Sequence, residues 1–212
     1  MKKPSKLVGP VVIGGVGGSG TRVISEILLK LGFYIGSDLN ISKDNLWFTY
    51  LFRWPRWFNR VRKKHGYEIK NRLNIFEKVM TTGLVENKKH YLPKLMWMGF
   101  NTILLDLPQK RSRIWLNTQL KFIRSRIRSF RRSKGFNPSK HIGWGWKEPN
   151  TLIFIKYLVE QFKDMKYVLV MRNGLDMAFS SNKKQLHNWG HLFNVNIPNS
   201  PEKMPQAALQ YW

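Results

Sequence analysis

The sequence predicts an α/β fold built around a parallel sheet. Two strand–loop–helix units carry this prediction, one near each end of the chain, and a long basic, aromatic-rich segment separates them. Strands that are each followed by a helix normally pair in parallel, because the helix returns the chain to the starting edge of the sheet. With 212 residues, of which 42% are hydrophobic, the chain is long and apolar enough to fold as one domain over 1–212.

The first unit lies near the N-terminus. The β-branched run at 11–13 predicts a short buried strand, and the glycine-rich loop GGVGGSG follows at 14–20. Apolar residues then recur at helical spacing, which predicts a helix over 21–31 that ends at Gly32. A polar turn region is expected at 36–45.

The middle of the chain, 46–140, is expected to be mostly helical and is strongly basic. From 108 to 140 it holds eleven Lys or Arg and no carboxylate. Within it, apolar and basic residues alternate at steps of three and four, which predicts a basic amphipathic helix over 113–133. Its cationic face is either solvated or docks an anionic substrate or lipid.

The second unit follows. A turn at 147–150 leads into a predicted helix over 151–163, and the apolar run 167–171 predicts a second buried strand. Further helices are expected over 174–186 and 204–212. The chain stops inside the last helical pattern, which indicates a fragment or a divergent short member of its family.

Charge and cysteine content limit the function classes. Against 37 Lys and Arg stand 12 Asp and Glu, so the net charge is +25, which favours an anionic partner unless it reflects a bias of the source. The absence of cysteine excludes disulfides, thiolate metal sites and cysteine nucleophiles, and it fits a reducing compartment. No signal-peptide pattern or membrane-spanning stretch is present. We therefore expect a cytoplasmic protein, with peripheral contact with a membrane as an open alternative.

The glycine loop predicts a phosphate site. Backbone N–H groups of such a loop and of the following helix N-terminus point toward an anion. A Walker A motif would need Lys where Thr21 stands, and a dinucleotide motif would need a second strand ending in an acid, whereas Asp38 lies in a turn. Neither a kinase nor a dehydrogenase is therefore supported. The residues expected to bind phosphate are Gly17, Gly18, Ser19, Gly20, Thr21 and Arg22.

A second phosphate-binding segment follows the later strand. Arg172 stands at the end of this strand and Ser180 follows eight residues later. A guanidinium fork and a hydroxyl can bind the same phosphate. The alternative is a surface ion pair between Arg172 and Asp176. Two phosphate-binding segments at strand ends would suit a ligand with two separate phosphate groups.

Three segments together resemble the PAPS-dependent sulfotransferases, whose donor is 3′-phosphoadenosine 5′-phosphosulfate. They are IGGVGGSGTRVI at 13–24, WGWKEPNT at 144–151 and YVLVMRNGLDMAFSS at 167–181. The motif style is closest to the bacterial and tyrosylprotein-type branches. The resemblance implies a P-loop NTPase-like three-layer sandwich in which 46–140 forms a helical, basic insertion on the acceptor side. It also implies that the glycine loop binds the 5′-phosphosulfate, that Arg172 and Ser180 bind the 3′-phosphate, and that no metal is needed.

The sequence departs from that family at Gly18, where a Lys or Arg usually contacts the transferring sulfonate. The leaving phosphate still needs a nearby cation. Lys147 of the K-[DE]-P element is the expected replacement, because the resemblance gives this lysine a donor contact, and Arg22 is the second choice. Without a cation at this point, the chain would be a binding-only or inactive relative.

The acceptor also needs a general base. Related branches carry a Glu some twenty to thirty residues beyond the loop cation, and Asp38 and Asp44 fall in that window. We favour Asp44, because the following Trp47-Phe48 could lower the local dielectric and raise its pKa. Asp38 or Asn40 would then orient the acceptor, unless both aspartates only cap turns. Three histidines are weaker candidates because they lie in no matched motif: His65, His90 and His141.

The sequence thus predicts a sulfotransferase that moves a sulfonate from PAPS to a hydroxyl or amine. The acceptor, a glycan, a lipid-linked substrate or a small molecule, is not identified by the sequence, and no specific nucleic acid is expected as a partner. The alternative is a non-catalytic cationic protein that binds RNA or an anionic glycan on a nucleotide-binding fold.

Overall fold

The fold is α/β, as predicted, and its centre is a four-stranded sheet in which all strands are parallel. The computed structural model describes residues 9–64, 66–85, 88–106, 112–130 and 133–212. The strand order is β2-β3-β1-β4. The strands are β1 (Val11–Gly15), β2 (Phe33–Tyr34), β3 (Gly143–Lys147) and β4 (Lys166–Val170).

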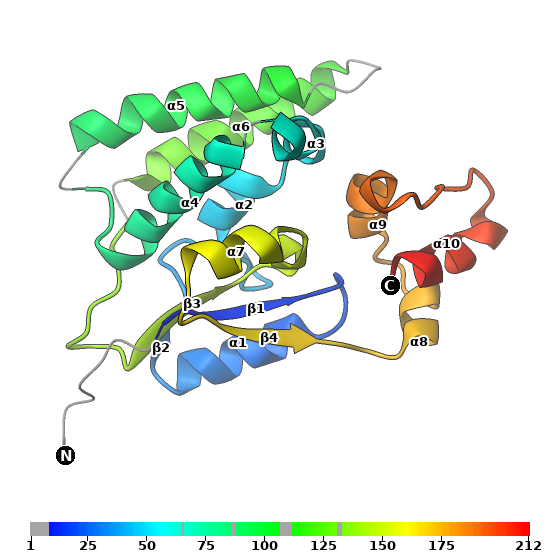
Figure 1. Cartoon of the computed structure of the whole chain (residues 1–212), viewed down its shortest axis with the longest axis horizontal. Helices are drawn as coiled ribbons and strands as arrows, with labels where there is room; N and C mark the ends of the chain where they lie inside the picture. Colours follow the sequence, from blue (N-terminus) through cyan, green and yellow to red (C-terminus); the bar gives the residue numbers. More distant parts are fainter. Residues whose placement is uncertain (1–8, 65, 86–87, 107–111, 131–132) are drawn as a thin grey trace.

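The two faces of the sheet are covered by different parts of the chain (Figure 1). Helix α1 (Thr21–Lys30) covers one face, where Leu28 packs with Ile13 and Ile35. On the other face Val12 and Trp146 join the main core, which continues into the helical part of the chain. This alternation follows from strand geometry, because successive side chains point to opposite faces.

The middle of the chain is helical, as predicted. Its helices lie on the side of the sheet opposite α1, and α5 is the outermost of them (Figure 1). Their aromatic residues fill the main core, where Phe48 contacts Phe52, Phe76 and Trp146. The helices are α2 (Leu46–Phe52), α3 (Pro55–Lys64), α4 (Gly66–Thr81), α5 (Lys88–Leu105) and α6 (Arg113–Ser129). The predicted basic helix over 113–133 corresponds to α6 but ends earlier, at Ser129; Ser133 is not helical, and positions 131–132 lie outside the described residues.

Strand β3 was not predicted, because its sequence GWGWK alternates only weakly. Its glycines explain both the weak pattern and the close pairing. A side chain at Gly145 would place its Cβ 1.9 Å from the carbonyl oxygen of Val11 on β1, so only glycine fits there.

The C-terminal part is more broken than predicted. The helix expected over 151–163 begins as the 3₁₀ turn η2 (Pro149–Phe154) and continues as α7 (Ile155–Gln161). The helix expected over 174–186 was wrong as one element, because α8 (Gly174–Phe179) ends before Ser180 and α9 (Lys184–Trp189) begins anew. The Lys183 ammonium donates hydrogen bonds to the carbonyls of Met177 and Ala178, at 2.8 and 2.6 Å, and so caps the end of α8.

After α9 the chain forms short turns and one more helix. These elements are η3 (Gly190–Phe193), η4 (Pro201–Lys203) and α10 (Met204–Tyr211), which packs against α8. They lie beyond the carboxyl ends of β1 and β4 (Figure 1). Within the described ranges, no helix is long and apolar enough to cross a membrane.

Candidate functional site

The candidate site lies at the carboxyl ends of β1 and β3. Strand β1 continues into α1 on one face of the sheet, whereas β3 continues through η2 into α7 on the other face (Figure 1). Adjacent strands whose connections leave on opposite faces open a crevice between their carboxyl ends, and ligands of open α/β sheets bind there. The topology therefore favours a site between the glycine loop and the segment after β3.

The glycine loop forms a tight turn into α1. Gly18 and Gly20 adopt positive φ angles of 105° and 96°, which side-chain-bearing residues rarely adopt. The Ser19 hydroxyl donates to the Val16 carbonyl at 2.7 Å and closes the turn. Gly20 is the N-cap of α1, and no side chain caps this end of the helix. The first N–H groups of α1 therefore lack the usual side-chain partner, which suits a bound anion.

The residues after β4 lie directly against this loop. A Cβ on Gly18 would lie 3.6 Å from the Ser180 hydroxyl oxygen and 3.6 Å from Met177 Cε. The Gly17 N–H donates to the Gln185 side-chain oxygen at 2.6 Å. The glycine loop and the end of α8 are thus neighbours in space, although Gly17 and Gln185 are 168 positions apart in the sequence.

Arg172 forms the surface ion pair that the sequence left as an alternative. Its Nε lies 3.2 Å from Asp176 Oδ2, and the two side chains are 49% and 56% exposed. Within the described ranges, Arg172 makes no hydrogen bond to the glycine loop or to Ser180. Arg22 likewise lies on the surface. Its Nε is 3.9 Å from Oε1 of Glu26, which stands one turn further along α1.

Lys147 and Asp44, the predicted cation and base, form an ion pair. The Lys147 Nζ lies 2.5 Å from Asp44 Oδ1 and donates to the Ser42 carbonyl at 3.0 Å. Lys147 is only 3% exposed, so its ammonium does not point to solvent. Its backbone is in register with Ile13 on β1, just before the glycine loop, but its ammonium contacts the turn after β2.

The surroundings of Asp44 differ from the expected ones. Trp47 and Phe48 pack into the main core, whereas the carboxylate of Asp44 contacts Lys147 and accepts a hydrogen bond from the Asn40 side chain at 2.8 Å. The Asp44 carboxylate thus contacts charged and polar groups, whereas the two aromatic side chains that follow it belong to the core.

Asp38 is bound elsewhere. Its carboxylate pairs with Arg126 of α6, and both side chains are largely buried. Its backbone carbonyl accepts from the N–H of Leu46 at 2.9 Å. These contacts hold the turn at 36–45 against α6, so Asp38 has the structural role that the sequence left open, and only Asp44 reaches the site.

Glu148 belongs to the site and was missed by sequence reasoning. It is 3% exposed, and its two carboxylate oxygens accept from the Asn150 backbone N–H at 2.7 Å and side-chain amide at 2.8 Å. The pKa of Glu148 is raised to about 7, mainly by burial and also by the charge of Asp44, while Arg53 and the hydrogen bonds from Asn150 oppose the shift. The signal that could have found it is a carboxylate directly after a buried strand.

Gln185 was missed as well, since nothing in the sequence connects it to the loop. The weaker candidates among the histidines lie away from this site. His141 contacts the rings of Tyr34 and Phe136, and His90 packs beside Tyr91, while His65 is outside the described residues. In the described part of the chain, no three acidic or histidine side chains are grouped to hold a metal ion.

Comparison with known proteins gave no match: no family model, curated protein or solved structure is significantly similar to this chain.

Proposed function

We propose that this protein is a sulfotransferase that uses PAPS as the donor and holds it across the glycine loop and the segment after β4. The observation that carries the proposal is Ser180 beside Gly18, because two segments with separate phosphate-binding signals adjoin at the carboxyl edge of one sheet. The uncapped start of α1, and the topology in which the connections of the adjacent strands β1 and β3 leave on opposite faces, support the same position.

The chemistry needs a cation and a base. The acceptor oxygen or nitrogen forms a bond to sulfur, the bond between sulfur and the 5′-phosphate oxygen breaks, and adenosine 3′,5′-bisphosphate leaves with the electron pair. Negative charge grows on the leaving oxygen while the acceptor loses a proton. We assign to Lys147 the neutralisation of the leaving oxygen and to Asp44 the removal of the acceptor proton. The two groups form an ion pair; Lys147 ends β3, and Asp44 follows the adjacent strand β2. Asn40 and Asp38 then hold the turn that carries Asp44.

The alternative function is a cationic protein that binds RNA or an anionic glycan without catalysis. It is favoured by Gly18, which supplies no cation, and by the pairing of Lys147 with Asp44. Peripheral contact with a membrane remains a prediction too. It is favoured by α5, whose outer face exposes Trp97, Phe100 and Leu104.

Thermal unfolding tests the proposal. We expect adenosine 3′,5′-bisphosphate to raise the Tm, and ATP and NAD to raise it much less, because only the bisphosphate offers a 3′-phosphate to Arg172 and Ser180. In the unchanged chain, we expect the Arg172 guanidinium to exchange Asp176 for the 3′-phosphate. Arg172→Ala should therefore remove most of this shift. Asp176→Asn is the matched control, because it removes the same ion pair but keeps the guanidinium.

Equal shifts from ATP and the bisphosphate would contradict the sulfotransferase proposal. No shift from any nucleotide, together with tight binding of RNA or a sulfated glycan, would favour the alternative function.

A further inference from the structure

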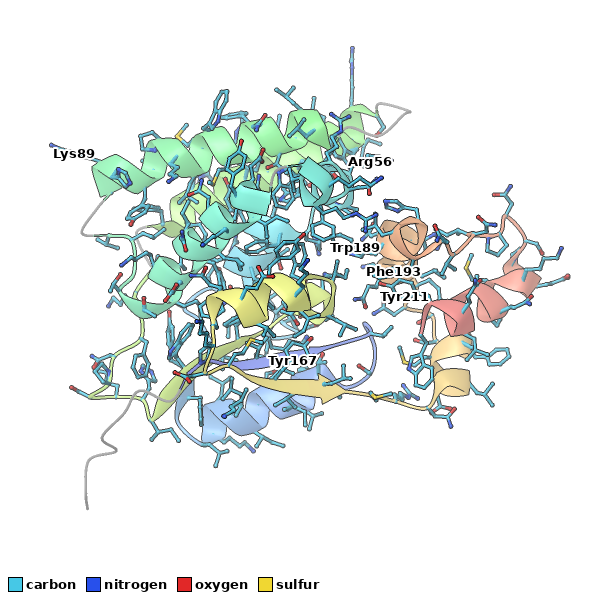
Figure 2. The ribbon with its side chains drawn as sticks, in the orientation of Figure 1. Arg56, Lys89, Tyr167, Trp189, Phe193 and Tyr211 are labelled. Carbon is cyan, nitrogen blue, oxygen red and sulfur yellow. The ribbon has the colours of Figure 1, made fainter. Side chains whose placement is uncertain are left out.

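A cleft of about 430 Å³ lies between the helical part of the chain and the elements after β4. It is bounded by the start of α3, the end of α5, the first turns of α6 and the segment α9–η3. An adjoining hollow of about 390 Å³ shares part of its lining, including Trp115 and His187. Figure 2 shows Arg56 on α3, on the side turned toward α9.

The lining of this cleft is cationic. Arg56 and Arg60 of α3 line the cleft itself, and the adjoining hollow adds Arg53, from the end of α2, and Lys184 of α9. In the part of the chain that the structure describes, none of these four side chains has a carboxylate within ion-pair distance. Like charges that line one hollow repel one another, and a bound anion would reduce that cost.

The acid in the lining, Asp106, interacts electrostatically with Arg56 and accepts a hydrogen bond from its guanidinium at the backbone carbonyl, so it offsets only part of the positive charge. Asp106 is buried, and its carboxylate accepts from the backbone N–H groups of Arg56 at 2.7 Å and Trp57 at 3.3 Å. It therefore caps the first turn of α3, and its charge is directed to the helix N-terminus.

The cleft adjoins the candidate site at two points. Lys184 is followed by Gln185, whose side chain contacts the backbone of Gly17 in the glycine loop. Arg53 interacts electrostatically with Glu148, the residue after Lys147. A molecule that extends into the adjoining hollow would thus contact Arg53 and Lys184, each of which is linked to a residue of the candidate site.

We infer that this cleft binds the acceptor and that the acceptor is an acidic saccharide, one that carries carboxylate or sulfate groups. The four cations would bind its acidic groups, while Trp115, Asn59 and Asn188 offer the ring face and amides that sugar rings and hydroxyls use. A groove for a single RNA strand would present several aromatic faces for successive bases. In this lining Trp115 is the one tryptophan that is partly exposed. The role as acceptor site rests on the proposed function, whereas saccharide binding does not.

Binding of a chondroitin sulfate tetrasaccharide to the full chain tests the inference. We expect Arg60→Ala/Lys184→Ala to weaken binding at least tenfold, because each charge-assisted hydrogen bond contributes about that factor or more. Both side chains are exposed, so the variant should fold normally. Lys156→Ala/Lys163→Ala is the matched control, since it removes two exposed lysines outside the cleft and should bind as the unchanged chain does.

Several results would overturn the inference. One is equal loss of binding in the two double variants, which would indicate general attraction to a basic surface. Another is binding of the uncharged tetrasaccharide maltotetraose with the same affinity. A third is that a short single-stranded RNA, or phosphatidylserine vesicles, displace the saccharide from the unchanged chain and bind more weakly to Arg60→Ala/Lys184→Ala but not to the control variant.

The thermal shift with adenosine 3′,5′-bisphosphate separates this inference from the proposed function. A bisphosphate shift with no saccharide binding overturns the cleft as a saccharide site and leaves the donor site in place. Saccharide binding that depends on Arg60 and Lys184, with no bisphosphate shift, supports the cleft and overturns sulfonate transfer.

Discussion

Lys147 is buried, and its ammonium pairs with the partly exposed carboxylate of Asp44. A buried charge that loses its partner becomes costly, by about 3–5 kcal/mol in typical cases. The pair therefore stabilises the turn after β2, whatever it does in catalysis. A test of catalysis at either residue has to separate this structural contribution from a chemical one.

The first prediction concerns Lys147→Ala. If Lys147 stabilises the leaving phosphate, this variant should lower kcat about 10²–10³-fold, while donor affinity changes less. Lys147→Arg should not restore the rate, because a broad guanidinium fork does not replace a compact ammonium at a tight site. Steady-state kinetics with saturating donor measures both effects.

The double variant Asp44→Asn/Lys147→Met, which removes both charges of the pair, is the control for a loss of stability. It should be more stable than Lys147→Ala, because no unpaired buried charge remains, and it should be inactive. Full activity in this double variant would remove both residues from the mechanism.

The second prediction concerns Glu148 and pH. Its folded-state pKa of about 7 lies above the ordinary value of 4.5, so between these two values the folded state binds more protons than the unfolded state. The free energy of unfolding should therefore fall as the pH rises from about 4.5 to about 7. Glu148 should contribute up to about 3 kcal/mol to this fall. Urea titrations at several pH values measure this slope.

Glu148→Gln should flatten that slope, because glutamine carries no charge at any of these pH values. The comparison uses the pH dependence rather than the absolute stability, since the new amide changes the contacts with Asn150 at every pH. If the free energy of unfolding of Glu148→Gln depends on pH as steeply as that of the unchanged chain, another group causes the dependence.

At the scale of the elements, the sequence predicted what local patterns encode. The strands at 11–13 and 167–171 and the helix after the glycine loop correspond to β1, β4 and α1. In each of these segments, apolar spacing agrees with the local structure, and glycines bound the first strand and the helix. Chain segments with such agreement can be predicted from a single sequence.

The elements that were missed depend on contacts between distant residues. Strand β3 is recognisable only beside β1, because the backbone of Val11 requires a glycine at position 145. The break at Ser180 depends on Lys183, which folds back onto the end of α8. The Lys147–Asp44 pair joins residues 103 positions apart. No periodicity in the sequence reports such pairings.

For the whole molecule, the excess of positive charge is the dominant electrostatic feature. A net charge of +25 on 212 residues repels itself, and compaction brings these charges closer together. Within the described ranges only four carboxylate–cation pairs lie within ion-pair distance, so most cations have no neighbouring carboxylate to offset the repulsion. The folded state should therefore be more sensitive to ionic strength than that of a charge-balanced protein.

The last prediction is that NaCl raises the Tm as its concentration increases through the range in which the Debye length falls from about 30 Å to about 10 Å. Screening weakens repulsion among the exposed cations, and it does so more in the compact folded state than in the expanded unfolded chain. An equal osmolality of sucrose is the control for solvent exclusion. A polyanion that occupies the cleft should raise the Tm further at constant ionic strength, since it binds only the folded arrangement of α3, α6 and α9. A Tm that does not change with NaCl would mean that the cations are too far apart in the folded state for their repulsion to matter.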